Sequence, residues 1–186
     1  MSETRQWSVT GDGYSRRMTK PEIAHPAYLL RVPSPIGRLE LTSDGTAITS
    51  LLIERDGALP LDDEPDNSTP VLETAAVQLG EYFAGTRRDF DLPVALGGTE
   101  FQRSVWRELS NIGFGEAASY GEIGHATGRA TAGRAVGGAV GANPIPIIVP
   151  CHRVLASNGR ITGYSGGNGI PTKVWLLEHE GISHSV

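Results

Sequence analysis

One stretch of the sequence combines a nucleophile with groups that could activate it. It runs from Pro144 to Val154 and contains Cys151, the only cysteine in the chain. An apolar, proline-containing run precedes the thiol, and His152 and Arg153 follow it directly. Structural cysteines are typically flanked by apolar residues on both sides, whereas a cationic neighbour lowers the pKa of a thiol and favours the thiolate. The stretch therefore predicts a reactive cysteine.

The composition limits the classes of protein to which this cysteine can belong. The 186 residues suffice for one domain or two small ones. No apolar run approaches the roughly 18 residues of a membrane span, and residues 1–27 lack the apolar segment of a secretory signal. A single cysteine cannot form an internal disulfide, which predicts a cytoplasmic protein. Because the only other soft ligands are five dispersed histidines, we expect no structural zinc site.

The net charge of −5 is unevenly distributed along the chain. Residues 1–100 carry 9 Lys and Arg against 16 Asp and Glu, a net charge of −7. Residues 101–186 carry 7 against 5, a net charge of +2. The half that contains Cys151 is therefore mildly basic, which permits a nucleic-acid partner without identifying one.

The first half predicts a small α+β scaffold behind an unpatterned leader at 1–27. Four segments have the composition of short strands, namely 28–32, 37–42, 47–53 and 89–96. Thr69 and Pro70 suit the N-cap and first position of a helix that ends at Gly85. Its expected buried face comprises Leu72, Ala76, Leu79 and Phe83. We find no chemistry in this half, and we interpret the acidic cluster at 62–64 as a solvated loop.

Two capping boxes mark helix starts in the second half. In each, a hydroxyl N-cap is followed three residues later by Gln or Glu: Thr99 with Gln102, and Ser119 with Glu122. The buried face of the first helix is expected to comprise Phe101, Val105, Trp106 and Leu109. The second box opens a shorter helix at about residues 120–127.

A glycine-containing turn joins this shorter helix to a third helix at 132–140, for which Thr131 is the expected N-cap. Two short helices joined in this way are a candidate helix-turn-helix. The third helix is rich in glycine, which costs about 1 kcal/mol per residue relative to alanine. Either close helix packing or close approach to a nucleic-acid groove would explain it. Arg134 is its single long polar side chain, which suits a minor groove better than base reading in the major groove.

Three further features follow the cysteine. Asn158-Gly159 lies between two short apolar runs and predicts a type I′ hairpin. Residues 163–167 form a glycine-rich loop whose backbone N–H groups could donate to a small acceptor. A last helix is predicted at 172–179, and Glu180 lies at its end, where a carboxylate is poorly placed against the helix dipole.

In the same order along the chain, these segments resemble motifs of the O6-alkylguanine-DNA alkyltransferases, also called methylated-DNA–protein-cysteine methyltransferases. The matching segments are Ser119 to Gly121, Arg134 to Gly137, Asn143 to Pro146, Pro150 to Val154 and Gly163 to Gly167. The resemblance runs from about residue 101 to 181 and is looser in the first half, where it rests on the turn from Ser34 to Gly37 and the helix end from Tyr82 to Gly85. It implies an α+β fold with a small ribonuclease H-like sheet-and-helix domain at 28–96. A mostly helical domain at 97–186 would hold the helix-turn-helix and the cysteine.

For the reaction, the resemblance implies a role for each of five residues. Cys151 accepts the alkyl group, and His152 takes the thiol proton through a water. Glu180 orients His152, and Asn143 holds the active-site turn together. Tyr120 donates to N3 of the target guanine. The resemblance implies neither metal nor cofactor, and a protein that is spent after one transfer.

For recognition, the resemblance implies that Arg134 fills the space that an extruded nucleotide leaves in double-stranded DNA. The implied DNA-binding residues are Ser119, Tyr120, Ala132, Gly133 and Arg134. The implied substrate pocket comprises Val140, Pro146, Val154, Tyr164, Ser165, Gly166 and Lys173. The expected partner is duplex DNA carrying O6-alkylguanine, with O4-alkylthymine as a second lesion to consider. The expected state is a monomer that can cluster along DNA, with no membrane association.

Two departures from the family pattern bear on these roles. Residues 168–172 lengthen the loop before Lys173, which puts the width of the pocket in question. Gly141-Ala142 stands where relatives often have a basic residue, which predicts modest DNA affinity. Three other classes stay open: an alkyltransferase-like damage sensor, a cysteine hydrolase with a Cys/His/Glu set, and a helix-turn-helix regulator. Cys151 counts against the sensor, its adjacency to His152 against the hydrolase, and the lone Arg134 against the regulator.

Overall fold

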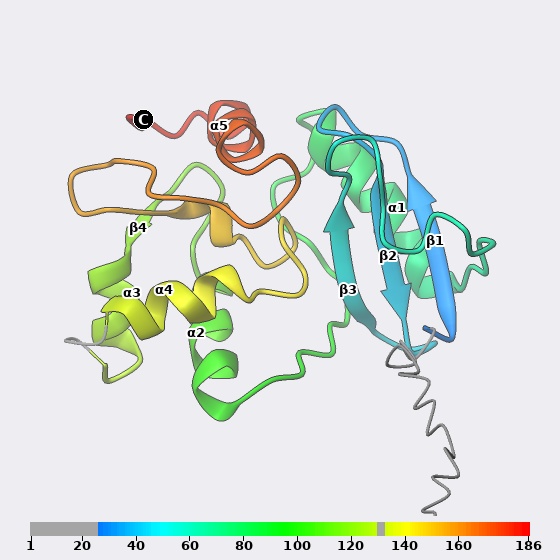
Figure 1. Cartoon of the computed structure of the whole chain (residues 1–186), viewed down its shortest axis with the longest axis horizontal. Coiled ribbons are helices and arrows are strands. Elements are labelled where there is room, and N and C mark those ends of the chain that lie inside the picture. Colours follow the sequence, from blue (N-terminus) through cyan, green and yellow to red (C-terminus); the bar gives the residue numbers. More distant parts are fainter. Residues whose placement is uncertain (1–25, 130–132) are drawn as a thin grey trace, which may run out of the picture.

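The computed structural model describes residues 26–129 and 133–186, so the predicted leader lies almost entirely outside it. The N-terminal half forms a sheet backed by a helix, and the C-terminal half is mainly helical (Figure 1). The fold class is therefore α+β, as the sequence predicts. The N-terminal helix lies on the face of the sheet that is turned away from the viewer (Figure 1).

The sheet is an antiparallel meander of β1 (Tyr28–Val32), β2 (Leu39–Ser43) and β3 (Ile48–Ile53). All five residues of the central strand are buried, although apolar and polar residues alternate along it. One face contacts the helix α1. On the other face the fully buried carboxylate of Glu40 accepts from the backbone N–H of Leu61 at 3.1 Å. The acidic loop that follows β3 therefore covers the second face.

Helix α1 (Pro70–Phe83) begins where the sequence predicts, because the Thr69 hydroxyl accepts from the N–H of Leu72 at 3.4 Å. Its buried residues are Leu72, Ala75, Gln78, Leu79 and Tyr82. The predicted face is thus wrong by about one position, since Ala76 and Phe83 are only half-buried. Two polar side chains caused the error: Gln78 bonds the backbone of Asp91, and Tyr82 has a buried partner described below.

The predicted strand at 89–96 does not form. Only Val94 makes a bridge, to Ile48, through hydrogen bonds of 2.8 and 2.9 Å that involve the neighbouring Pro93 and Ala95. Proline lacks a backbone N–H, so Pro93 cannot extend the pairing as a donor. The segment runs along β3 as an irregular connection to the C-terminal half.

The C-terminal half contains α2 (Glu100–Ser110), α3 (Tyr120–Ala126), α4 (Gly133–Gly141) and α5 (Ile170–His179). Both predicted capping boxes are present, with Thr99 and Ser119 as N-caps. Helices α2, α3 and α4 contact one another, which matches a helix-turn-helix supported by a third helix (Figure 1). The predicted N-cap Thr131 and the predicted DNA contact Ala132 lie outside the described residues.

The predicted type I′ hairpin at Asn158-Gly159 is wrong. A turn occurs there, closed by a 2.9 Å bond from the Ala156 N–H to the Arg160 carbonyl. Gly159 has a positive φ but Asn158 does not, and a type I′ turn requires both. Instead of pairing across the turn, β5 (Val154–Leu155) pairs in parallel with β4 (Ala118–Ser119). The pairing partner thus lies far away in sequence.

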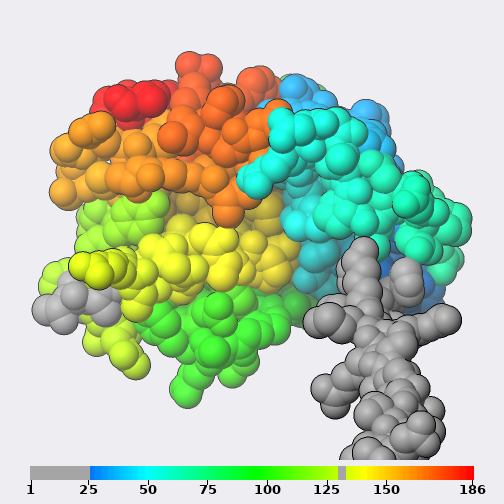
Figure 2. Space-filling view, in the orientation of Figure 1, coloured from blue at the N-terminus to red at the C-terminus, as the bar shows by residue number. Residues whose placement is uncertain are grey.

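The two halves share one hydrophobic core. It extends from sheet residues such as Leu41 through Tyr82 to Val105 and Cys151. The N–H of Leu51 in β3 also donates to the carbonyl of Pro144 at 2.9 Å. Figure 2 shows the segment near residue 165 directly beside the segment near residue 55. Among the described residues, no helix is long and apolar enough to cross a membrane.

Candidate active site

Cys151 is the first residue of a short 3-10 helix, η1 (Cys151–Arg153), which packs against α5. The residue is only 3% exposed. Asn143 fixes the loop before it: its Nδ2 donates to the Val149 carbonyl at 2.7 Å, and its Oδ1 accepts from the Ile145 N–H at 3.1 Å. Ile147 in this loop has a φ of 73°, which is strained for a β-branched residue. Side-chain and backbone contacts thus hold the thiol in a rigid loop.

Burial raises the pKa of the Cys151 thiol above its ordinary value. The side chains of Asn143 and Tyr164 and the charge of Lys173 oppose this effect but do not reverse it. The expectation of a lowered pKa in the free protein is therefore wrong. The prediction assumed that the charge of Arg153 would act on the thiol, but Arg153 is bound to the carboxylate of Glu180. A buried thiol with a raised pKa needs a base to take its proton.

His152, the residue after Cys151, forms a hydrogen-bonded pair with Glu180. Both are buried, and His152 Nε2 lies 2.9 Å from Glu180 Oε1. The same carboxylate accepts two bonds from Arg153, from Nε to Oε2 at 2.7 Å and from Nη2 to Oε1 at 2.9 Å. The Tyr82 hydroxyl of α1 donates to Oε1 at 2.7 Å. Oε1 therefore has three hydrogen-bonding neighbours and Oε2 has one.

The electrostatics of this cluster determine which ring nitrogen of His152 carries the proton. Burial alone would raise the pKa of Glu180, but hydrogen bonds from His152 and Arg153 lower it to about 2. Burial lowers the pKa of His152, so its ring is neutral at pH 7. Since the ionised carboxylate can only accept, Nε2 carries the proton. Nδ1 is then the basic nitrogen, and it is buried without a partner among the described residues.

Lys173 and Tyr164 complete the surroundings of the thiol. Lys173 is 1% exposed, and its Nζ donates to the Val154 carbonyl at 2.6 Å. Burial lowers the pKa of Lys173 to about 8. Burial, and after it the neighbouring Cys151, raise the pKa of Tyr164, so its hydroxyl keeps its proton. This hydroxyl is buried with no hydrogen bond of normal geometry in the part of the chain that the structure describes. It is free to donate to an oxygen brought beside the sulfur.

Gly166 explains how Tyr164 is placed. A Cβ at Gly166 would lie 2.8 Å from the Tyr164 ring, closer than real side-chain contacts. Only glycine therefore allows the loop to pass over this tyrosine. The glycine-rich character of 163–167 is thus required by packing around the site.

The parallel pair β4–β5 connects the helix-turn-helix to the thiol. Ser119 pairs with Leu155, so Tyr120 follows directly from a strand that is bonded to the segment after Cys151. The Tyr120 hydroxyl lies 3.4 Å from Thr162 Oγ1. A surface hollow is lined by Tyr120, Gly133, Gly137, Thr162 and Gly163. The hollow opens where α3, α4 and the loop after β5 meet.

The exposed face of α4 is nearly bare. Arg134 is exposed, and a Cβ added at Gly133, Gly137, Gly138 or Gly141 would meet nothing within 4 Å. Close packing within the chain therefore does not require these glycines. Val136, Ala139 and Val140 form the buried side instead. The helix presents a flat backbone surface with one long cation at its start.

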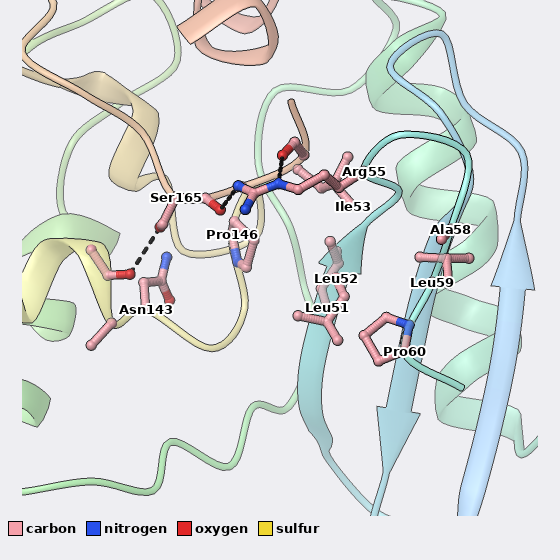
Figure 3. Close-up of a pocket in the computed structure, with 14 residues that line it drawn as sticks. Leu51, Leu52, Ile53, Arg55, Ala58, Leu59, Pro60, Asn143, Pro146 and Ser165 are labelled. Carbon is pink, nitrogen blue, oxygen red and sulfur yellow. Dashed lines mark hydrogen bonds between the residues drawn. The ribbon is translucent and has the colours of Figure 1, made fainter. Parts of the chain in front are cut away.

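A second cavity, of 530 Å³, lies between the two halves beside their shared core (Figure 3). Asn143, Pro146, Ser165 and Gly166 line one side of it, and residues of β3 and the following loop line the other. Figure 3 shows Arg55 reaching across to the backbone of the 163–169 loop. None of residues 168–172 lines this cavity. Asn168 instead accepts from the N–H of Asp56 at 3.1 Å, so the lengthened loop is held against the N-terminal half.

The sequence missed three side chains that support the site. Tyr82 and Arg153 bind Glu180, and Arg55 binds the carbonyls of Ser165 and Gly167. The expectation that the first half contributes no chemistry is therefore wrong. The resemblance at Tyr82-Phe83-Ala84-Gly85 was a signal for the first of these. Nothing local in the sequence marks Arg55.

The predicted site residues form three adjoining groups. Asn143, Tyr164 and Lys173 act on the Cys151 thiol, Lys173 also bonds Val154, and His152, the next residue in the chain, is bonded to Glu180. Ser119, Tyr120, Gly133 and Arg134 lie on or beside the helix-turn-helix, and Val140 is buried under it. Pro146, Ser165 and Gly166 border the cavity between the halves. No group of three or more His, Cys, Asp or Glu suited to a metal ion occurs within 26–129 and 133–186. Together these features define a protein with a buried cysteine beside a helix-turn-helix.

Comparisons with known proteins identify the family. Residues 28–96 match the profile of the "6-O-methylguanine DNA methyltransferase, ribonuclease-like domain", and residues 100–182 that of its DNA-binding domain. The methylated-DNA–protein-cysteine methyltransferase of Mycolicibacterium paratuberculosis is 46% identical over 136 residues, covering 73% of this chain and 82% of the relative. The constitutive enzyme of Bacillus subtilis is 40% identical, covering 84% and 97%.

Solved structures agree with these sequence matches. The O6-methylguanine methyltransferase of Mycobacterium tuberculosis has a TM-score of 0.73 and 43% identity, covering 82% of this chain and 92% of that one. The same organism's protein in complex with DNA gives a TM-score of 0.72. The chain belongs to the O6-methylguanine DNA methyltransferase family. Its function is direct-reversal DNA repair as a methylated-DNA–protein-cysteine methyltransferase, and DNA is its partner.

Proposed function

We propose that Cys151 accepts the alkyl group of O6-alkylguanine in duplex DNA, in one step and once per molecule. The observation that carries the proposal is the unpartnered Nδ1 of His152, whose Nε2 is fixed by Glu180 at 2.9 Å. A neutral imidazole oriented by a buried carboxylate is the arrangement that activates a neighbouring nucleophile. A water can carry the proton from the thiol to Nδ1.

The transfer is balanced without a cofactor. The sulfur attacks the alkyl carbon in line, the S–C bond forms, and the C–O6 bond breaks. The electron pair of the broken bond goes to the guanine, which takes up one proton, while the thiol gives up one to His152. Tyr164, whose hydroxyl keeps its proton, and Tyr120, whose hydroxyl accepts from Thr162 Oγ1 at 3.4 Å, are suited to donate to the leaving base. The thioether product does not hydrolyse, so the protein is consumed.

The substrate base must leave the duplex to reach a thiol that is 3% exposed. Extruding a nucleotide costs a few kcal/mol, less at a damaged pair. The bare glycine face of α4 allows the helix to approach the minor groove closely, and Arg134 can then fill the vacated stack. The proposed substrate pocket comprises seven residues, namely Val140, Pro146, Val154, Tyr164, Ser165, Gly166 and Lys173. The two domains are 28–96 and 97–186.

The working state that we propose is a monomer, which can cluster along DNA, in the reducing cytoplasm. A reducing compartment keeps the lone Cys151 as a free thiol. O4-alkylthymine is the second lesion to test.

Mass spectrometry tests the proposal. After incubation with duplex DNA containing O6-methylguanine, the peptide with Cys151 should gain one methyl group, with one mole transferred per mole of protein. A Cys151→Ala variant should gain none and should still bind the DNA. Methyl on another residue, or repeated turnover, would overturn the proposal.

A further inference from the structure

Tyr120 and Thr162 meet at the rim of the hollow beside α4. Their hydroxyl groups are 42 positions apart in the sequence but 3.4 Å apart in the fold, and the Thr162 hydroxyl donates to the phenol oxygen. The Tyr120 ring packs against the main core, whereas Thr162 is exposed. A phenol has one proton to donate, and this one has no acceptor in the part of the chain that the structure describes. The contact therefore leaves the Tyr120 proton available to another molecule.

The backbone at Tyr120 is fixed by the segment that follows the cysteine. Tyr120 is the first residue of α3, and the preceding Ser119 forms a complete capping box with Glu122. Ser119 also pairs with Leu155 of β5. Because the cap and the strand pairing both act on the residue before Tyr120, the phenol enters the hollow from a defined direction.

The backbone at Thr162 is fixed through its neighbour Ile161. This side chain is 5% exposed and belongs to a small second core with Leu155, Leu177 and Ile182. The Ile161 N–H also donates to the Ser185 carbonyl at 2.8 Å. Leu155 contributes to both supports, since it pairs with the residue before Tyr120 and shares a core with the residue before Thr162. One common scaffold therefore holds the two hydroxyl groups together.

We propose that Thr162 is a positioning residue for the transfer: its hydroxyl holds the Tyr120 phenol so that the phenol's own proton points into the hollow, towards the leaving guanine. Threonine suits this task because branching at Cβ restricts its χ1 rotamers, so the donor needs little further ordering. Thr162 keeps its own proton and acts only through Tyr120. The inference rests on the proposed function, in which Tyr120 donates to N3 of the base.

Single-turnover rates test the inference, with all of the DNA bound by excess protein. Thr162→Val removes the hydroxyl with little change in shape, and Thr162→Ser keeps it. Thr74→Val is the matched control, because Thr74 is also exposed and its hydroxyl donates to the Pro70 carbonyl at 2.8 Å on α1. The duplexes carry either O6-methylguanine or its 3-deaza analogue, which has carbon in place of N3 and cannot accept a proton there.

We expect Thr162→Val to slow transfer from O6-methylguanine about threefold to tenfold, the effect of losing one hydrogen bond. Thr162→Ser and Thr74→Val should stay within about twofold of wild type. On the 3-deaza substrate all three variants should match wild type within about twofold, because a misdirected proton no longer matters. Equal slowing on the two substrates, an unchanged rate in Thr162→Val, or a Thr162→Ser variant that is as slow as Thr162→Val would overturn the positioning role.

A double-mutant cycle with Tyr120→Phe separates the inference from what it rests on. In the Tyr120→Phe background, Thr162→Val should cause no further loss, because no phenol remains to be held. Additive losses would overturn the inference. A wild-type protein that transfers methyl equally fast from both bases would overturn the donor role of Tyr120 and this inference with it. Absence of transfer to Cys151 in the wild type would instead overturn the proposed function itself.

Discussion

The hydroxyl of Tyr82 donates to Glu180 Oε1 at 2.7 Å, which joins two residues that are 98 positions apart in the sequence. Tyr82 belongs to the helix that backs the sheet, and Glu180 caps the last helix. The carboxylate that orients His152 is therefore held from both halves. The N-terminal half is therefore part of the proposed catalytic arrangement as well as its scaffold.

Tyr82→Phe removes this bond while keeping the ring contacts in the core. We expect the free energy of unfolding to fall by about 1.5–3 kcal/mol, as for other hydrogen bonds to charged groups. Urea unfolding measures the loss. Tyr28→Phe is the control, since that hydroxyl has no hydrogen bond among the described residues and should change stability by less than about 0.5 kcal/mol. Equal losses in the two variants would contradict a special role for the Tyr82 hydroxyl.

Glu180→Gln keeps the shape of the side chain but removes its charge. Transfer to Cys151 should slow by about 10²-fold or more, because His152 loses the group that orients it and stabilises its cation. Stability should fall by about 3–5 kcal/mol, because Arg153 is left as an unpaired buried cation. Single-turnover rates at low temperature, with DNA binding as the measure of folded protein, check both. Glu178→Gln, on the exposed side of the same helix, should change neither.

The same carboxylate predicts how stability depends on pH. Its folded-state pKa of about 2 lies below the ordinary value of 4.5, so its contribution is present above pH 4.5 and is lost as pH falls towards 2. At about 1.4 kcal/mol per pKa unit, the loss is about 3 kcal/mol. His152 adds to it: since burial lowers its pKa, the unfolded chain binds a proton below about pH 6.5 that the folded protein does not. Urea unfolding between pH 7 and 3 should therefore show a steeper decline for wild type than for Glu180→Gln. Parallel curves would contradict the lowered pKa.

Arg134 is exposed at the start of a helix that bears no other long side chain on its open face. Arg134→Ala should weaken repair of duplex DNA by about 1–3 kcal/mol and leave the reaction with free O6-benzylguanine within about twofold. Reaction rates on both substrates give the comparison. Arg103→Ala makes the same change in charge on α2 and should reduce neither rate by a comparable factor. Equal losses on both substrates would exclude a role in filling the stack.

Arg55 connects the N-terminal half to the loop around Tyr164. Arg55→Ala should cost about 1 kcal/mol of stability through its two lost backbone bonds. Hydrogen exchange of the amides at 164–167 should become faster, because the loop loses its anchor to β3. Arg87→Ala, which breaks a surface ion pair with Glu81 at 2.6 Å, is the control and should leave that exchange unchanged. Arg55→Lys should restore protection only in part, because lysine cannot reproduce the two-point contact.

The elements that local residue patterns determine were predicted correctly. The elements that depend on contacts between distant segments were not. The capping boxes at Thr99 and Ser119 were found because all their partners lie within three residues. The prediction of a hairpin at Asn158-Gly159 was wrong because β5 pairs with a strand some thirty-six positions earlier, at Ser119. Pairing between distant segments leaves no trace in a short window of sequence.

The site divides in the same way. Cys151 and His152 stand out because adjacent residue types suggest reactivity, and family resemblance adds Glu180. Arg55 was missed because its partners are backbone carbonyls 110 and 112 positions away, which have no side-chain signature. The predicted direction of the thiol pKa shift was wrong for a related reason. The sequence shows a cationic residue close to Cys151. In the fold, burial raises the pKa of the thiol, and the charge of Arg153 is paired with Glu180.

The position of Glu180 along the chain has a consequence for how the protein is made. Ribosomes add about 5–20 residues per second, and N-terminal segments generally fold first. Tyr82 and Cys151 therefore emerge before the carboxylate that they depend on. A nascent chain carries its nucleophile beside a histidine that nothing yet orients. Under the proposed mechanism, alkyl transfer requires Glu180 to have reached Tyr82 and His152, so a protein that works once would not be used up during its own synthesis.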